Sequence, residues 1–238
     1  MTTHEPTILA IETATHVLAV AICRGERVLA EVKWQAGLIH AERIIPSCLN
    51  MLEGLDLAWE DLDAVAVSQG PGSFTSLRIG FGTAKGIALA HDLPLVLIPT
   101  LEALAAQIPY CQHPVCATLD ARKDEVYAAW FDTSSGQAAR LTDDSLYSPE
   151  ALVGSITEQT VCVGNGWVRY GAFWTERLKN TVRTAPPWGH LPTASVVGLL
   201  GMRRFINGVR DDPDTATPLY LRRSQAQEAA SEKPPMVV

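Results

Sequence analysis

The segment from Ser68 to Gly86, SQGPGSFTSLRIGFGTAKG, holds five glycines in nineteen residues and leads from a predicted strand into a predicted helix. Glycines between a strand and a helix are typical of phosphate-binding loops, whereas glycines inside a helix indicate that another group comes close to its backbone. Gly80, Gly82 and Gly86 lie within the predicted helix 75–91, where each costs about 1 kcal/mol relative to alanine. We therefore expect a close contact along this helix that offsets the cost.

None of the common nucleotide-binding motifs fits this segment. A P-loop requires GxxxxGK[ST], but Lys85 precedes Gly86 and neither Ser nor Thr follows. A dinucleotide fingerprint requires GxGxxG, and Thr75 occupies the position of its third glycine. Pro71 also removes one of the backbone N–H groups that such a loop would present. The sequence therefore does not predict a catalytic nucleotide loop here.

Three small residues of the predicted helix share one face. Gly82, Gly86 and Ala90 are spaced i, i+4 and i+8, and residues at this spacing are neighbours on a helix surface. Such a groove allows another helix to approach closely and gain dispersion contacts along its length. The same spacing would also suit packing on the protein's own sheet, so spacing alone leaves both interpretations open.

Apolar runs along the chain predict two related α/β halves. Three β-rich runs, TILAIETAT, HVLAVAICRG and RVLAEVKW, form a meander, and alternating helices and strands then complete the order βββαβαβα. The pattern restarts with the hairpin VCATLDA and EVYAAWFD and continues as a shorter copy, with helices expected at 148–156, 170–180 and 193–208. We expect two subdomains with a cleft between them and a loose tail. Their predicted ranges are 1–108, 109–223 and, for the tail, 224–238.

The composition describes a soluble globular protein and argues against a nucleic-acid-binding surface. Hydrophobic residues make up 47% of the chain and charged residues 19%, as in ordinary folded domains. The net charge is −7 and the pI about 5.3, whereas clustered Lys and Arg bind phosphate backbones. The N-terminus lacks the pattern of a secretory signal, and no apolar run is long enough to span a membrane. Five cysteines without a CxxC pair favour reduced thiols and a cytoplasmic protein.

Six segments of the chain together resemble the bacterial TsaB family, also called YeaZ. They are ILAIETAT, SQGPGSFTSLRIGFGTAKGIA, PTLEALA, LDARKDEVYAAWF, VGNGW and TPLYLRR, in the order of the family from about Thr7 to Arg223. The resemblance implies an actin-like, Hsp70-like (ribonuclease H-like) fold with a degenerate second subdomain. It also implies an accessory role in the threonylcarbamoyl modification of adenosine 37 in tRNAs that read codons starting with A.

The resemblance further implies particular partners. Members of the family act with TsaD, which transfers the threonylcarbamoyl group, and with the ATPase TsaE. This chain would bind TsaD directly as a heterodimer, form a homodimer when alone, and reach tRNA only through its partner. We expect the small-residue helix face to be the docking surface. The residues expected there are Gly82, Gly86, Ala90, Arg78, Phe81 and Lys85.

The positions that hold phosphate in actin-like ATPases are weakened in this chain. By the resemblance, each of two hairpins would carry an acidic residue beside a glycine-rich turn. Glu12 stands in the first, IETAT, and Asp120 in the second, LDARKDE, but neither turn contains glycine. The adenosine side is reduced to Gly164 and Gly166 around Asn165. These residues are weak cofactor candidates, and we expect a pseudoenzyme that binds no cofactor tightly by itself.

Two groups of metal-binding residue types are incomplete. The catalytic relative binds its metal through two helical histidines four residues apart, and this chain has His40 but Ile44 at the second position. Cys111, His113 and Cys116 lie within six residues, yet a structural zinc site needs four ligands and the sequence has no second cluster. Neither group predicts a metal site.

The charged turn DARKDE allows two interpretations. It is either a solvated hairpin tip or, since the resemblance places it at the cleft, a gating or partner-contacting element. The residues concerned are Asp120, Arg122, Lys123, Asp124 and Glu125.

Two other functions compete with the accessory role. A serine hydrolase or glycoprotease-like enzyme would use Ser73 with His91, although the sequence has neither a GxSxG elbow around this serine nor an identifiable acidic partner. A nucleotide-binding sensor of the sugar-kinase branch would share the same fold. One departure from the family pattern also concerns docking, because Ser76 stands where glycine is usual and could act as a helix N-cap or alter partner affinity.

Overall fold

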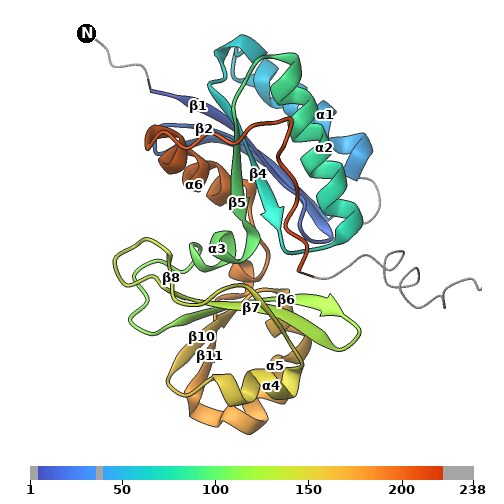
Figure 1. Ribbon diagram of the computed structural model, residues 1–238. Helices are drawn as coiled ribbons and strands as arrows, with labels where there is room; N and C mark the ends of the chain where they lie inside the picture. Colours follow the sequence, from blue (N-terminus) through green and yellow to red (C-terminus); the bar gives the residue numbers. More distant parts are fainter. Residues whose placement is uncertain (1–4, 36–39, 222–238) are drawn as a thin grey trace, which may run out of the picture.

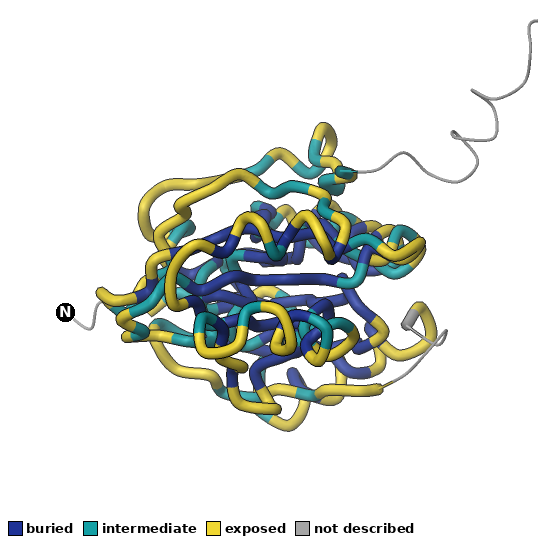
Figure 2. The backbone as a smooth tube through the Cα atoms, turned by 90° about the horizontal axis from the view of Figure 1, so that it is seen from below, coloured by how far each residue is buried: buried dark blue, intermediate teal, exposed yellow. Residues whose placement is uncertain are grey.

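The computed structural model describes residues 5–35 and 40–221. These residues form two mixed β-sheets flanked by helices, one above the other in the view of Figure 1. The burial map in Figure 2 shows buried strands between helices whose outer turns are exposed. Within the described ranges, no helix combines the length and the apolar character needed to cross a membrane. The predicted tail, 224–238, lies outside them.

The first sheet has five strands in the order β3-β2-β1-β4-β5. The β-rich runs form the predicted meander, since β1 pairs antiparallel with β2 and β2 with β3. The next two strands continue the sheet parallel to β1, and their nearly continuous apolar sequences suit burial on both faces. The strands are β1 (Thr7–Glu12), β2 (Val17–Arg24), β3 (Arg27–Gln35), β4 (Ala64–Gly70) and β5 (Leu95–Pro99).

Two neighbouring helices cover one face of the first sheet. α1 (His40–Gly54) and α2 (Phe74–Ala90) lie side by side (Figure 1), and their apolar residues join those of β1, β2 and β4 in one core cluster. A short 3-10 helix, η1 (Trp59–Asp61), follows α1. Ile44, which the sequence places where the catalytic relative has its second histidine, is fully buried in this core. The side chain of His40 lies outside what the structure describes.

The last helix returns to the first sheet. α6 (Ala194–Ile206) falls within the expected second subdomain, but it packs on the opposite face of the first sheet, against β1, β2 and β4. Gly198 permits this contact, because an added Cβ would lie 2.6 Å from the Sγ of Cys23. The first structural half is therefore not a continuous piece of the sequence, and a boundary at residue 108 assigns α6 to the other half.

The second sheet has six strands, several of them only two to four residues long, and follows the first sheet in the chain. Its main order is β11-β10-β6-β7-β8, and β9 pairs with β7. α3, between the two sheets, contributes to the core of the second, and α4 and α5 pack on the other side of it. The elements are α3 (Thr100–Ala105), β6 (Val115–Arg122), β7 (Glu125–Asp132), β8 (Ala139–Arg140), β9 (Ser145–Tyr147), α4 (Pro149–Ser155), β10 (Thr160–Val163), α5 (Asn165–Leu178), η2 (Lys179–Thr181), β11 (Val182–Thr184) and η3 (Pro187–His190).

The second half repeats the framework of the first, as the sequence predicts. In each half the first strand of an antiparallel hairpin pairs in parallel with a strand that leads into a helix: β1 with β4 and then α2, and β6 with β10 and then α5. α5 begins five residues before the predicted start at Tyr170. The reason is tertiary, since the Thr118 hydroxyl of β6 accepts a hydrogen bond from the Trp167 N–H in its first turn.

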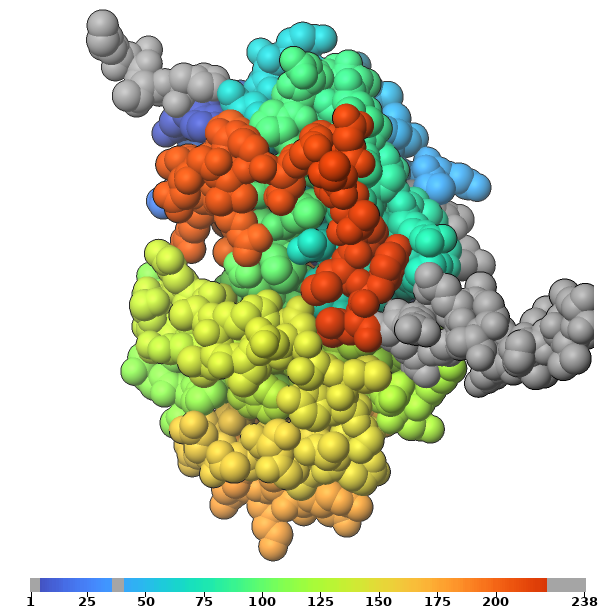
Figure 3. Space-filling model, viewed as in Figure 1, coloured from blue at the N-terminus to red at the C-terminus, as the bar shows by residue number. Residues whose placement is uncertain are grey.

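A C-terminal strap (residues 209–221) runs from α6 along the first half to the second. Asp211 N donates to the Leu95 carbonyl of the edge strand β5 at 2.8 Å, and Leu219 N donates to the Gln69 carbonyl at 2.8 Å. Leu221 then packs against the core of the second half. Figure 3 shows the strap in red on the surface, reaching the yellow second half at its lower end.

Candidate functional site

The outer face of α2 exposes the small residues that the sequence singles out. An added Cβ at Gly82 or Gly86 would meet no atom of the described residues within 4 Å, and both glycines and Ala90 are exposed. Leu89 beside them is 55% exposed. The spacing left packing on the parent sheet open as an alternative, and the structure places these three residues away from the sheet.

The inner glycines of the same segment do make internal contacts. An added Cβ at Gly80 would lie 2.0 Å from the Oγ1 of Thr13, and one at Gly72 would lie 2.3 Å from the Ala14 carbonyl oxygen. These two glycines therefore let α2 and its preceding loop dock on the turn between β1 and β2. The segment thus serves two purposes, one on each side of the helix.

Phe81 corrects the predicted docking surface. It is only 3% exposed and belongs to the core under α2. The buried residues Leu77, Phe81, Ala84 and Ala88 follow helical spacing on the side facing the sheet. Phe81 therefore cannot contact a partner directly, because its side chain is already packed against the protein's own strands.

Two other residues expected at the docking surface hold the strap. The Nε of Arg78 donates to the hydroxyl of Tyr220 at 3.3 Å, while its guanidinium lies 4.1 Å from the ring centroid of Phe74. The Nζ of Lys85 donates to the strap carbonyls of Asp214 and Ala216, at 3.3 and 3.2 Å. Both side chains thus border the open face and fix the strap along one edge of α2.

The neighbouring helix α1 also carries two exposed apolar residues. Ile45 is 39% exposed and Leu49 is 48% exposed, on the helix that lies beside α2 (Figure 1). Neither residue was predicted from the sequence. A signal was available, since α1 carries more apolar residues than its buried side needs, and Ile45 and Leu49 each stand one position after a fully buried residue.

The first hairpin turn buries its acidic residue. Glu12 is fully buried, and its Oε1 accepts a hydrogen bond from Ala14 N at 2.6 Å. The hydroxyl of Ser68 donates to its other oxygen. Burial raises the pKa of Glu12 to about 7, although these hydrogen bonds lower it. The carboxyl group is thus taken up by the protein's own groups and withdrawn from the surface.

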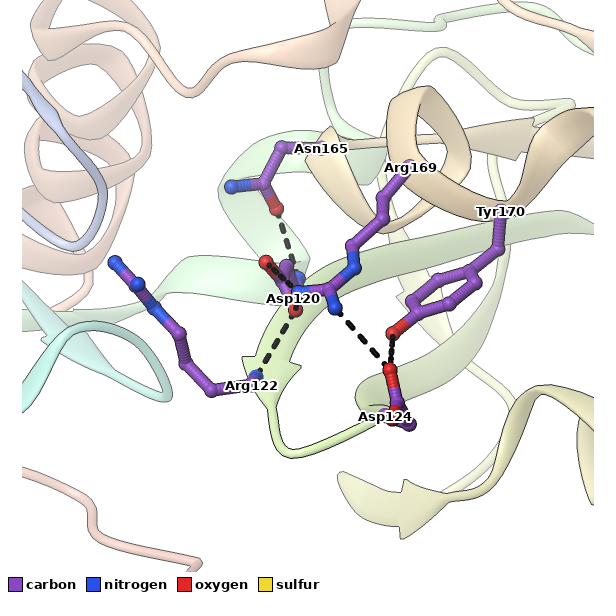
Figure 4. Close-up of polar contacts among 6 residues, drawn as sticks. All are labelled: Asp120, Arg122, Asp124, Asn165, Arg169 and Tyr170. Atoms are coloured by element: carbon purple, nitrogen blue, oxygen red, sulfur yellow. Dashed lines mark hydrogen bonds and ion pairs between the residues drawn. The ribbon is translucent and has the colours of Figure 1, made fainter.

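The second hairpin turn pairs its acidic residue with a cation instead (Figure 4). Asp120 accepts two hydrogen bonds from the Nη1 of Arg169, at 3.0 and 2.9 Å. Arg169 also contacts Asp124 at 3.2 Å, and the hydroxyl of Tyr170 contacts the same carboxylate at 3.3 Å. Asp120 N donates to the Oδ1 of Asn165. α5 thus supplies three side chains that fix the turn.

The tip of this hairpin has an unusual backbone. Arg122, Lys123 and Asp124 have φ values of 63, 50 and 53°, a left-handed conformation that favours glycine and costs energy for other residues. In Figure 4 the Arg122 side chain extends away from the cluster around Asp120. Glu125, also expected in the cleft turn, begins β7 and is partly buried. The turn is therefore shaped by its ion pairs as well as by local sequence preference.

Gly164 and Gly166 serve the packing of α5 on β6. Gly164 has a φ of 107°, and an added Cβ would lie 1.9 Å from the carbonyl oxygen of Thr118. An added Cβ at Gly166 would lie 2.9 Å from the Cβ of the same threonine. Gly164 N also donates to the Nδ1 of His190 at 3.2 Å, and burial lowers the pKa of that histidine. The internal contacts account for both glycines without a bound nucleotide.

The residues of the hydrolase hypothesis are not brought together. Ser73 and His91 stand at opposite ends of α2, a helix of seventeen residues and about 25 Å. The Ser73 hydroxyl contacts Ser76 at 3.0 Å, and the His91 ring stacks on Trp59 with centroids 5.0 Å apart. Ser73 also takes the N-cap position that the sequence suggested for Ser76.

The cysteines of the incomplete cluster Cys111, His113 and Cys116 differ in burial. Cys116 is buried within β6, whereas Cys111 is only partly buried in the segment before it. Among the described residues, no group of three or more His, Cys, Asp or Glu side chains could hold a metal ion.

The chain is similar to known proteins in both sequence and fold. A model of the TsaD family, described as tRNA N6-adenosine threonylcarbamoyltransferase, matches residues 35–230. The tRNA threonylcarbamoyladenosine biosynthesis protein TsaB of Bacillus subtilis (strain 168) is 33% identical over 203 residues, which cover 84% of this chain and 79% of that protein. YeaZ from Pseudomonas aeruginosa superposes with a TM-score of 0.77 at 27% identity, covering 91% of this chain and all of that one.

A more distant structure shows the fold alone. The ethanolamine utilization protein EutJ from Carboxydothermus hydrogenoformans superposes with a TM-score of 0.53 at 12% identity, covering 85% of this chain and 92% of that one. The actin-like fold expected from the sequence is therefore confirmed. Together with the identity to TsaB over most of both chains, this places the protein: the chain belongs to the TsaB family, also called YeaZ.

Proposed function

We propose that this chain is a non-catalytic accessory subunit in the synthesis of threonylcarbamoyladenosine at adenosine 37 of tRNAs that read codons starting with A. It binds and stabilises the catalytic subunit TsaD, together with the ATPase TsaE, in the cytoplasm. The names of the B. subtilis relative and of the matching family support this assignment. When no TsaD is present, a second copy of the chain takes its place.

The open glycine face of α2 carries the proposal. Gly82 and Gly86 together cost the helix about 2 kcal/mol relative to alanine, and no atom of residues 5–35 or 40–221 lies within 4 Å of where their side chains would be. Internal packing therefore does not offset this cost. A helix of a partner seated on the face would offset it, because the absence of Cβ atoms lets two backbones approach closely.

The two hairpin turns support the non-catalytic part of the proposal. Glu12 is buried and hydrogen-bonded within the protein, and Asp120 is paired with Arg169. Neither carboxylate stands ready to hold a phosphate-bound cation. We therefore expect the isolated chain to bind no nucleotide tightly and to hydrolyse none. The net charge of −7 likewise supports contact with tRNA only through the partner.

The decisive experiment compares leucine at two exposed glycines. Gly86→Leu places a bulky side chain on the docking face. Gly154→Leu does so on α4 in the other half, where an added Cβ also meets no atom within 4 Å in the part of the chain that the structure describes. Leucine favours a helix over glycine, so both variants should fold at least as stably as the natural chain. Binding to TsaD from the same organism is measured by co-purification and calorimetry.

We expect Gly86→Leu to weaken TsaD binding by about 100-fold or more, because the clash lies at the centre of the face. Gly154→Leu should leave the affinity unchanged. If Gly86→Leu folds stably and binds TsaD as tightly as the natural chain, the docking surface lies elsewhere. If the purified natural chain and TsaD show no binding at all, the accessory role is wrong.

A further inference from the structure

The chain itself connects the two halves near α3 and α6. One connection passes from Pro99, at the end of β5, into α3, whose Leu101 is fully buried in the core of the second half. The other returns from η3 to Thr193, the N-cap of α6. The two helices are also tied to each other, since Arg204 of α6 pairs with Glu102 of α3 at 2.7 Å. Both connections are therefore linked to the helix that covers the α6 side of the first sheet.

The end of the strap joins the halves on the opposite side. Tyr220 packs on Phe74 of α2, with ring centroids 4.9 Å apart, and Leu219 N donates to the Gln69 carbonyl. The next residue, Leu221, packs against the core of the second half. α2 covers the face of the first sheet opposite to α6. Three consecutive residues thus bridge from one half to the other on the α2 side, where the red strap meets the second half in Figure 3.

The first half is shaped to hold this segment. Gly70 has a φ of 113°, and an added Cβ would lie 2.6 Å from the carbonyl oxygen of Leu219, so a larger residue there would push the strap away. Arg78 holds the hydroxyl of Tyr220 at 3.3 Å. Ala216 packs against the core under α2. Backbone, polar and apolar contacts therefore all fix the strap before it crosses to the second half.

The position of the crossing has a mechanical consequence. Two bodies that are joined along one side can rotate about that side, as hinged domains do. A third attachment away from the hinge opposes the rotation, because opening would pull Leu221 out of its core or break the contacts of Tyr220. We propose that residues 219–221 act as a bolt that fixes the angle between the two halves. The chain then presents both halves to other molecules as one rigid body and does not open and close around a ligand.

Distances between two spin labels, one in each half, test the bolt in the full chain. The labels are attached to Asn50→Cys on α1 and Ala172→Cys on α5, two exposed helical positions. Cys111→Ser removes the partly buried native thiol, and the other four cysteines are buried. With the natural strap, double electron–electron resonance should give one narrow distance distribution. Leu221→Asp places a carboxylate against an apolar core, so it should release the bolt and broaden the distribution about twofold or more.

A matched variant controls for the added charge. Val209→Asp places the same carboxylate at the exposed start of the strap and should leave the distribution narrow. Circular dichroism checks the fold of each variant, and Leu221→Ala, which removes only the apolar contact, decides the question if Leu221→Asp unfolds. An unchanged distribution in a folded Leu221 variant would overturn the proposal, as would equal broadening in Val209→Asp. A broad distribution with the natural strap would overturn it as well, because the angle would then not be fixed.

Discussion

The two halves of the molecule place an acidic residue near the end of the first strand of a hairpin, yet they treat its carboxylate differently. Glu12 is fully buried and accepts hydrogen bonds from Ala14 N and Ser68. Asp120 is only partly buried and pairs with Arg169 at 2.9 Å. One carboxylate is withdrawn from water, and the other is neutralised by a cation.

The difference shows that the framework of the fold persists without the chemistry of its turns. In both halves a glycine lets the following helix or its leading loop dock on the hairpin: Gly80 against Thr13, and Gly164 against Thr118. Each contact fixes a helix or its leading loop on the hairpin of its own half, whatever the charge of the carboxylate in that half. A partner contact is therefore expected on the outer face of α2, where no contact within the described ranges explains Gly82 and Gly86.

The largest effect is expected where the framework contact involves backbone. Gly164 has a φ of 107°, and its added Cβ would lie 1.9 Å from the Thr118 carbonyl, so Gly164→Ala should lower the free energy of unfolding by more than about 3 kcal/mol. Gly154→Ala, at an open helical position, should raise it by up to about 1 kcal/mol. Urea denaturation measures both. A loss below about 1 kcal/mol for Gly164→Ala would contradict the tight docking of α5.

The buried carboxyl of the first turn should impose a pH dependence on stability. Burial raises the pKa of Glu12 from 4.5 to about 7, so the folded state holds its proton more tightly than the unfolded chain. Its stabilising contribution is present below pH 4.5 and is lost as the pH rises through 7. In Glu12→Gln this dependence disappears, and the variant should exceed the natural chain by up to about 3 kcal/mol at pH 8.

Denaturation of both proteins at pH 5 and pH 8 checks this expectation. At pH 5 the difference should be small, because Glu12 is then largely protonated in the fold and resembles the neutral amide. Should Glu12→Gln be less stable than the natural chain at pH 8, the ionised carboxylate would be favoured by its hydrogen bonds. The first turn would then resemble the second in keeping its charge.

Local sequence patterns predicted most elements of the fold, and tertiary contacts explain the exceptions. The meander and the second hairpin follow from β-rich runs and a polar turn. α5 was expected to begin at Tyr170, but Thr118 from a distant strand binds its first turn at Trp167. Nothing in the sequence of α6 says which sheet it covers, since Gly198 has meaning only beside Cys23.

The candidate site was predictable only in part. The spacing of Gly82 and Gly86 identified a special face, but spacing could not decide whether that face looks inward or outward. Phe81 was wrong as a docking residue, although its helical relation to the buried Leu77 and Ala84 could have shown it. The pairing of Asp120 with Arg169 joins residues that are distant in the chain, and no local signal indicates it.

The second half should show a pH dependence of opposite sign. The Nδ1 of His190 accepts the hydrogen bond of Gly164 N, and its Nε2 lies 3.2 Å from the Thr184 hydroxyl. The neutral ring is therefore required, and burial lowers its pKa. Since the unfolded histidine takes up its proton more readily, stability is lost as the pH falls through 6.5.

Combining variants separates the pH dependence that His190 causes from the one that Glu12 causes. Glu12→Gln removes the dependence of the first turn and keeps that of His190, so stability should fall between pH 7 and pH 5. Adding His190→Gln, which keeps an oxygen acceptor and an N–H donor, should flatten the curve. A steep fall that persists in the double variant would assign the dependence to other groups.

The smallest effect is expected at the exposed ion pair of the second turn. Asp120→Asn keeps the Oδ1 that accepts from Arg122 N but removes the charge that faces Arg169, and screened surface pairs contribute little to stability. The loss of stability should lie within the error of urea denaturation and shrink further at high salt.

The affinity for TsaD, measured on the same variant, sharpens the comparison between the two turns. A clear drop in affinity at unchanged stability would make the second turn a partner contact rather than a solvated hairpin tip. If the affinity is unchanged, the outer face of α2 remains the proposed TsaD contact, and it is then this face that distinguishes the chain from a catalytic actin-like protein. Glu12→Gln, the corresponding variant of the first turn, should then change the free energy of unfolding but not the affinity for TsaD.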